Sequence, residues 1–234
     1  MYCSKKDTGM KHSTLPQNLA NTTLVVPGCS ASLVDNFAID WIIESLGLQS
    51  VAVFDSENVT PMVQQGVFGE SKITSAMELY SAPDSTVSVL QIRSSVVSHE
   101  GLAKELVELG QQFARIVVIG AASAFMLSGK GLEETSRFRV LGAAQDGWAS
   151  IELADVHQGG ILKRLVSAES KVPLSCYLVL TSGQGYVETR FLSEELAAKT
   201  VDVLGLKLDR LLTPKSVLTL ERPPVMTPEL ERIL

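Results

Sequence analysis

Residues 116–119 read Ile-Val-Val-Ile, an unbroken run of β-branched apolar side chains that ends at Gly120. Successive side chains of a strand point to opposite faces of the sheet, so a strand that is apolar at every position needs cover on both faces. Two further runs that are apolar at every position occur at 24–26 and 51–54. The chain is therefore predicted to build a sheet that is sandwiched between helices.

Four helices are predicted between these strands. Ser32 stands three residues before Asp35 at the spacing of a capping box, and Ser98 precedes a second amphipathic stretch. Two further helices are expected after Gly159-Gly160 and over 189–204, and three further strands over 77–80, 87–92 and 174–181. This alternation predicts an α/β fold: a single three-layer α/β/α sandwich with a mostly parallel sheet and one antiparallel hairpin.

The domain boundaries are predicted from composition. Residues 1–22 are polar and aperiodic and are expected to form a mobile N-terminal tail. Residues 23–221 are expected to form one α/β domain, and residues 222–234 a Pro-rich, extended C-terminal tail.

Charge and composition exclude several classes of function. With 20 Lys and Arg against 26 Asp and Glu, the net charge of −6 does not suit a phosphate backbone, so no nucleic-acid partner is expected. The most apolar stretch, 116–127, is shorter than a bilayer-spanning helix, and the first fifteen residues lack the apolar core of a secretory signal. Three cysteines at unrelated spacings indicate neither a disulfide framework nor a metal site. A soluble protein of a reducing compartment is expected, with no membrane contact.

Open α/β sheets bind ligands at the carboxyl ends of their strands. These ends are expected at 27–30, 55–57, 93–95 and 120–123, and most of the residues there are small. Arg93 could supply the counter-charge for an anion in such a crevice, or could pair with a nearby carboxylate. Cys29 could be a reactive thiol at a helix start or a small buried residue, and His99 a general base or an exposed first-turn residue. No nucleophile stands beside a base in the sequence, so no catalytic residue is assigned.

Two apolar stretches are expected to face outward. The apolar surface of the first helix is wider than the surface that packing against one sheet would bury. Phe37 and Trp41 of this helix are therefore predicted to contact another chain. The loop at 55–75 contains Pro61, Met62 and Val63, which are predicted to be partner anchors. For Met62 the alternative is that it folds back as part of a satellite core.

Several short blocks together resemble one known family. Pro27, Ser30 and Val34, with 38–40, 42–43 and Leu46, are followed by 60–63, by 78–81 with Pro83, by 90–94 and by 159–161. Their order and spacing are similar to those of the proteasome assembly chaperone 2 family. The resemblance covers about Thr23 to Leu212 and is strongest in the first hundred residues.

The resemblance implies a phosphorylase-like fold and a non-enzymatic chaperone without cofactors. Such a protein pairs with a proteasome assembly chaperone 1-type subunit as a heterodimer. The pair binds proteasome α subunits in the cytoplasm and nucleus, promotes 20S α-ring assembly and prevents off-pathway dimerisation of α rings. Two alternatives are an enzyme of the phosphorylase or hydrolase type that uses the crevice around Arg93, and a scaffold subunit of another ring or filament.

The last three residues depart from one pattern of the family. Some members end in a hydrophobic residue, a tyrosine and any residue, a motif that docks between α subunits, whereas this sequence ends in Arg232, Ile233 and Leu234. The Pro-rich tail is expected either to reach the α ring through these residues or to fold back, because Thr227-Pro228 is a good helix start.

Overall fold

The computed structural model describes residues 10–13, 15–16, 19–65, 73–127, 136–156, 160–182 and 186–206. Its main sheet contains β1 Lys11–His12, β2 Thr23–Pro27, β3 Gln49–Asp55, β6 Met77–Ser81, β7 Val87–Ile92, β8 Arg115–Ser123, β9 Phe138–Leu141, β10 Ala149–Ile151 and β11 Leu174–Thr181. The helices are α1 Val34–Ser45, α2 His99–Gly110, α3 Gly160–Ser167 and α4 Tyr186–Val203. Short 3₁₀ turns lie at Leu19–Asn21, Ala124–Met126 and Leu153–Asp155.

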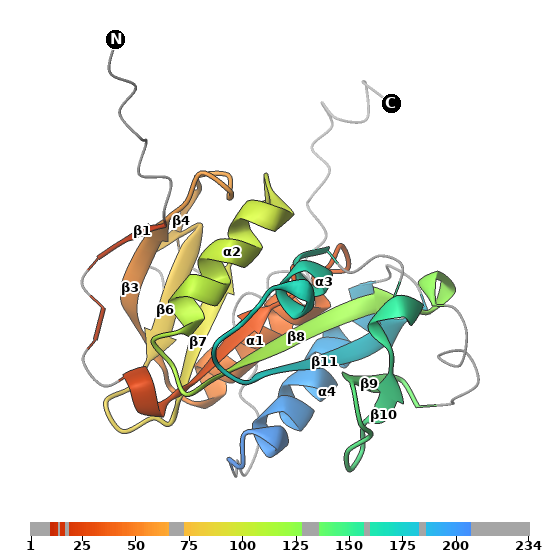
Figure 1. The fold of residues 1–234 in the computed structure, drawn as a ribbon. Coiled ribbons are helices and arrows are strands. Elements are labelled where there is room, and N and C mark those ends of the chain that lie inside the picture. The colour runs from red at the N-terminus through yellow and green to blue at the C-terminus, as the bar shows by residue number, and fades with distance from the viewer. Residues whose placement is uncertain are drawn as a thin grey trace, which may run out of the picture.

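The helices cover both faces of the sheet, as the sequence predicts (Figure 1). Helices α1 and α4 pack together on one face, and α2 and α3 on the other. Each face has its own apolar cluster, because residues of β8 alternate between the two: Ile116 and Val118 face α2 and α3, whereas Val117 and Ile119 face α1 and α4. The prediction of an α/β fold built on a doubly covered sheet is confirmed.

Strands are ordered β1-β3-β6-β7-β2-β8-β11-β9-β10 among the described residues. The central strands β7, β2, β8 and β11 are parallel, and the predicted hairpin β6–β7 is antiparallel. Antiparallel pairs also join β1 to β3, β3 to β6 and β11 to β9, so the sheet has more antiparallel pairing than the single hairpin expected.

Two local predictions need correction. Helix α1 is not capped by Ser32. Its N-cap residue is Leu33, which has the left-handed conformation with φ 58°, and no side chain forms a capping hydrogen bond there. Ser98, in contrast, accepts a hydrogen bond from the Gly101 amide, as predicted for the start of α2. The loop expected at 55–75 contains a second, two-stranded sheet, in which β4 Val63–Gln65 pairs with β5 Ile73–Ser75.

Part of the expected N-terminal tail belongs to the domain. Lys11 and His12 pair with the end of β3, and the Ser13 amide donates to the Val53 carbonyl at 3.2 Å. Leu19 is buried in the core. The described residues within 10–22 are therefore part of the folded domain and not of the expected mobile tail. The expected C-terminal tail, 222–234, lies outside the described residues.

Candidate functional site

One edge of the main sheet collects the ends of several strands, and we call it the carboxyl edge. Strands β7, β2, β8 and β11 are parallel and end there. Strand β3 is antiparallel to β6, which is itself antiparallel to β7. Strand β3 therefore runs in the same direction as β7 and ends at the same edge. Loops that are far apart in the sequence therefore meet at this edge, which is where open α/β sheets place their ligand sites.

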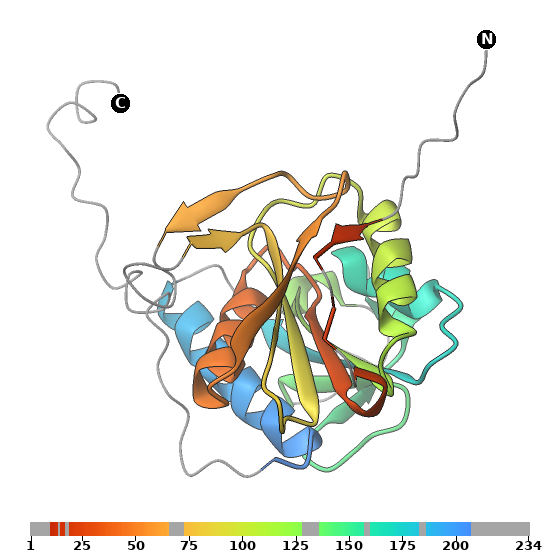
Figure 2. The same ribbon diagram turned by 90° about the vertical axis from the view of Figure 1, so that its left-hand side faces the viewer.

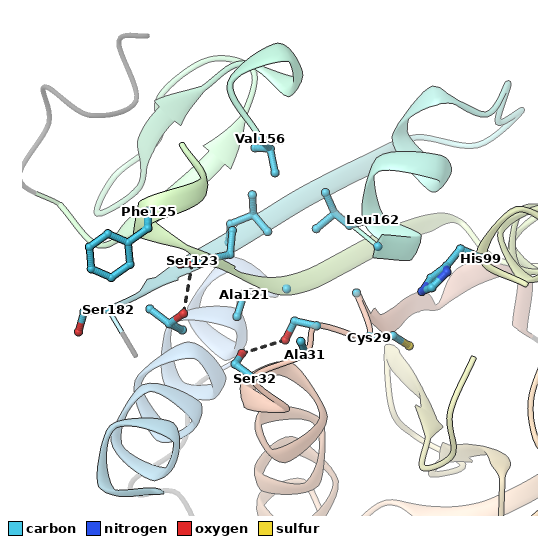
Figure 3. A pocket seen from close by; sticks show the side chains of 17 residues that line it. Cys29, Ala31, Ser32, His99, Ala121, Ser123, Phe125, Val156, Leu162 and Ser182 are labelled. Atoms are coloured by element: carbon cyan, nitrogen blue, oxygen red, sulfur yellow. Dashed lines mark hydrogen bonds between the residues drawn. The ribbon is translucent and has the colours of Figure 1, made fainter. Parts of the chain in front are cut away.

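A cavity of about 550 Å³ lies at the carboxyl edge (Figure 3). It is lined by residues that follow three adjacent strands: 28–32 after β2, 120–123 at the end of β8, and 181–182 at the end of β11. The sequence predicts 28–30 and 120–123 at this edge, whereas the other two predicted strand ends, 55–57 and 93–95, do not line the cavity. It missed Thr181 and Ser182, although the predicted end of the last strand at 181 was a usable signal.

The loop after β2 is held by a buried carboxyl group. Asp35, in the first turn of α1, accepts hydrogen bonds from the Ser30 hydroxyl at 2.6 Å and the Ser30 amide at 2.9 Å. Burial raises the pKa of Asp35, and the hydrogen bonds from Ser30 partly oppose this change. The side chain that the sequence places in a capping box with Ser32 thus anchors the cavity loop instead.

The two candidate catalytic residues, Cys29 of this loop and His99 of α2, both line the cavity, Cys29 half-buried and His99 exposed. Burial, with a smaller contribution from Asp35, raises the pKa of the Cys29 thiol far above its usual range, so the reactive thiolate is disfavoured. His99 is an exposed residue in the first turn of α2 and lines the cavity (Figure 3). Of the remaining histidines, His12 lies on β1, and His157 lies outside the described residues.

Arg93 does not line the cavity. Its guanidinium forms a two-pronged ion pair with Asp40 of α1, at 2.7 and 3.1 Å. Burial alone would lower the pKa of Arg93, but Asp40, with a contribution from Tyr80, raises it above its usual value. The interpretation of Arg93 as an anion clamp in the crevice is therefore wrong, and its alternative, pairing with a nearby carboxylate, is confirmed.

Large apolar side chains are exposed around the carboxyl edge. Leu33 follows β2, Val63 follows β3, Val97 follows β7 and Phe125 follows β8, with exposed fractions of 49%, 76%, 67% and 81%. We call these four residues the apolar rim. Among the described residues, the other strongly exposed large apolar side chains are Val53 and Phe191. Apolar exposure concentrated on one edge is typical of a protein–protein contact surface.

The predicted anchor loop contributes to this rim. Pro61 and Val63 are exposed, whereas Met62 is half-buried and packs against the core. The loop is held by backbone hydrogen bonds from the Thr60 amide to Ser95 and from the Val97 amide to Asn58. Figure 2 shows the β4–β5 hairpin at the top of the view, beyond the end of β3 and the start of β6.

The other predicted anchors divide into three groups. Phe37 is half-buried on α1 and stays a candidate. Trp41 is only 1% exposed, because α4 of the same chain packs against α1 and the two helices enclose it with the sheet, so its prediction as a surface anchor is wrong. Arg232, Ile233 and Leu234 lie outside the described residues.

The described residues offer neither a membrane-spanning helix nor a cluster of metal ligands. None of the helices described here combines the length and apolarity needed to cross a membrane. In the same part of the chain, no three His, Cys, Asp or Glu side chains gather where they could hold a metal ion.

Comparisons with known proteins agree on one family. The model of the PAC2 family matches residues 24–211. Proteasome assembly chaperone 2 of Xenopus laevis is 28% identical over 140 residues, which cover 56% of this chain and 54% of the relative. The chain spans about half the length of the curated relatives it matches.

Solved structures share the fold at low sequence identity. A protein of unknown function from Thermoplasma acidophilum has a TM-score of 0.66 at 17% identity, covering 88% of this chain and 85% of the other. Pyrococcus furiosus PbaA, an archaeal homologue of proteasome-assembly chaperone, has a TM-score of 0.60 at 15% identity, covering 86% of this chain and 88% of the other.

Proposed function

Because the chain belongs to the PAC2 family, we propose that it is a proteasome assembly chaperone that acts by binding alone. In this proposal it pairs with a proteasome assembly chaperone 1-type subunit. The pair binds proteasome α subunits, promotes assembly of the 20S α ring and prevents off-pathway dimerisation of α rings. Occupying one face of an assembling ring suffices for both effects, because a covered face cannot make rival contacts.

The apolar rim is the observation that carries this proposal. Val63, Val97, Leu33 and Phe125 expose apolar surface in the segments that follow four strands, all of which end at the carboxyl edge. A stable heterodimer buries about 1,200–2,000 Å² in total, and its central contacts are usually apolar. We propose that the rim supplies such contacts, with Pro61 beside Val63 and with Phe37 on α1.

Properties of the cavity support binding rather than catalysis. Burial keeps the Cys29 thiol protonated, and Asp40 holds the Arg93 guanidinium away from the cavity lining. The thiol would need to lose its proton, and the guanidinium would need to leave Asp40, before either could act on a substrate. The proposal therefore assigns no chemical step and no cofactor to this chain.

The test is co-expression of the full chain with a chaperone 1-type subunit and addition of purified proteasome α subunits. Val63→Asp is the sharpest variant, because Val63 is 76% exposed and a buried charge at an interface strongly weakens binding. We expect at least a tenfold loss of affinity for the chaperone subunit or for α subunits, with an unchanged Tm.

The matched control is Val53→Asp, a second exposed valine that lies within β3 and outside the apolar rim. Wild-type binding by Val63→Asp would remove the rim from the proposal. Turnover of a nucleoside or ester by the purified chain would overturn binding as the mode of action, and recovery of another ring or filament without α subunits would overturn the proteasomal role.

A further inference from the structure

A line of buried polar side chains runs beneath α1 to the β4–β5 hairpin. Asp40, Glu78, Tyr80 and Gln91 are each no more than 3% exposed, and the Arg93 side chain is 8% exposed. Glu78 faces Gln91 across the antiparallel β6–β7 pair. Tyr80 lies two residues further along β6, and Arg93 lies two residues after Gln91, just past the end of β7 and on the other side of the Glu78–Gln91 pair. Residues two apart along a strand share a face of the sheet. The line thus occupies the sheet face that α1 covers.

Each step of this line is a hydrogen bond or an ion pair. On α1, Asp40 accepts from Arg93 at 2.7 and 3.1 Å and from the Gln91 amide group at 2.7 Å. The Arg93 guanidinium also interacts with the Tyr80 hydroxyl, and that hydroxyl donates to a Glu78 carboxyl oxygen.

The line ends on the backbone of the hairpin. The second carboxyl oxygen of Glu78 accepts a hydrogen bond from the Ser75 amide at 2.6 Å. Ser75 lies directly opposite Val63 in the β4–β5 pair. Helix α1, which covers this sheet face, is thereby linked to the strand pair that carries Val63 of the apolar rim.

We propose that Glu78 and Tyr80 are positioning residues, which set where the hairpin holds Val63 relative to α1. This inference rests on the proposed function, since it assigns the buried line to the presentation of a docking residue. Burying charged groups costs as much free energy as their attraction returns, so a buried ionic line contributes little net stability. The line instead fixes the side chains in a single arrangement, because each polar group has one set of hydrogen-bond partners within reach.

The variant that breaks the line in the middle is Tyr80→Phe. It removes one hydroxyl, which contacts both Glu78 and Arg93, and leaves the ring in the core. We expect hydrogen exchange of the Ser75 amide to accelerate about tenfold, because the carboxyl that accepts from it loses its own orienting partner. Tyr80→Phe should also bind about tenfold more weakly to the same partner, the chaperone 1-type subunit or the α subunits, for which Val63→Asp weakens binding.

Tyr177→Phe is the matched control. Tyr177 is also buried, and its hydroxyl also donates to one side-chain oxygen, that of Gln145 at 3.0 Å, but it lies on β11, far along the sheet order from the hairpin. It should match Tyr80→Phe in Tm, while its Ser75 exchange and its binding stay at wild-type values. Glu78→Leu, which deletes the acceptor itself, should show the same effects as Tyr80→Phe.

The outcomes separate this inference from the proposed function. If Val63→Asp weakens binding while Tyr80→Phe and Glu78→Leu behave like Tyr177→Phe, the positioning role is overturned and the docking surface stands. Faster Ser75 exchange with unchanged binding also overturns it, since the position of the hairpin would then not matter. If Val63→Asp itself binds normally, the docking surface fails first, whatever the exchange rates show.

Discussion

The backbones of Gly28 and Gly120 pass each other at the carboxyl ends of β2 and β8 so closely that a Cβ on Gly28 would lie 3.3 Å from the Gly120 Cα. The same Cβ would lie 3.3 Å from the Ile119 carbonyl oxygen, which accepts a hydrogen bond from the Gly28 amide at 2.7 Å. Both neighbours are backbone atoms of a buried central strand, which cannot move aside as a side chain can.

Gly28→Ala is therefore expected to destabilise the domain. Crowding of this kind in a packed interior costs about 1–3 kcal/mol. Chemical denaturation of the full chain measures the change, and the volume of the cavity should shrink in a structure of the variant. An unchanged free energy of unfolding would show that the two backbones separate freely.

Trp41 and Phe37 should respond differently to truncation. Trp41 is buried beneath α4, so Trp41→Ala is expected to lower the free energy of unfolding by about 3–5 kcal/mol. Phe37 is half-buried, so Phe37→Ala should cost less stability and, if it contacts a partner, more affinity. Denaturation and binding measurements on both variants check this, and equal stability losses would contradict the burial difference.

The pH dependence of stability should contain a contribution from Asp35. Its pKa in the folded chain is raised above 3.8 by burial, so the folded state holds this proton more tightly than the unfolded state. Stability from this group is therefore present at low pH and is lost as the pH rises through the raised pKa. In Asp35→Asn this loss should disappear.

The measurement compares the free energy of unfolding of wild type and Asp35→Asn from pH 4 upward. The variant should gain on the wild type as the pH rises. A difference between the two proteins that stays constant with pH would mean that Asp35 titrates normally in the folded chain.

The C-terminal residues give a separate prediction. Removing Ile233 and Leu234 should weaken binding to the α ring several-fold if the tail docks there through its terminal carboxylate and apolar side chains. Binding of the truncated and full chains to purified α rings measures this, with heterodimer formation as the control that should not change. Equal affinities would leave docking to the folded domain alone.

Local patterns predicted the elements well, because side-chain periodicity reports burial directly. The apolar run at 116–119 became a central strand covered on both faces, and Ser98 became the cap of α2. The sequence also predicted that the strand ends at Gly28 and Gly120 lie close together, because parallel strands end at the same edge of a sheet.

Predictions of what covers a surface were less successful. The sequence of α1 shows that more than one surface packs on it, but not whether the second surface belongs to this chain or to another. The structure places α4 there, and Trp41 is buried as a result. Similarly, Arg93 could serve an anion or a carboxylate, and only the approach of Asp40 decides between them.

The sequence by itself determined the helices α1 to α4, the strands β2, β3, β6, β7, β8 and β11, the α/β class and the family, all of which depend on the order and spacing of residues along the chain. It did not predict the shorter strands β1, β4, β5, β9 and β10. The tertiary structure alone decided that Trp41 is buried, that Arg93 pairs with Asp40, and that exposed apolar residues from four separate loops share one edge. The physical reason is that burial and ion pairing depend on which distant segments pack together. The periodicity of a single segment does not specify which other segments it packs against.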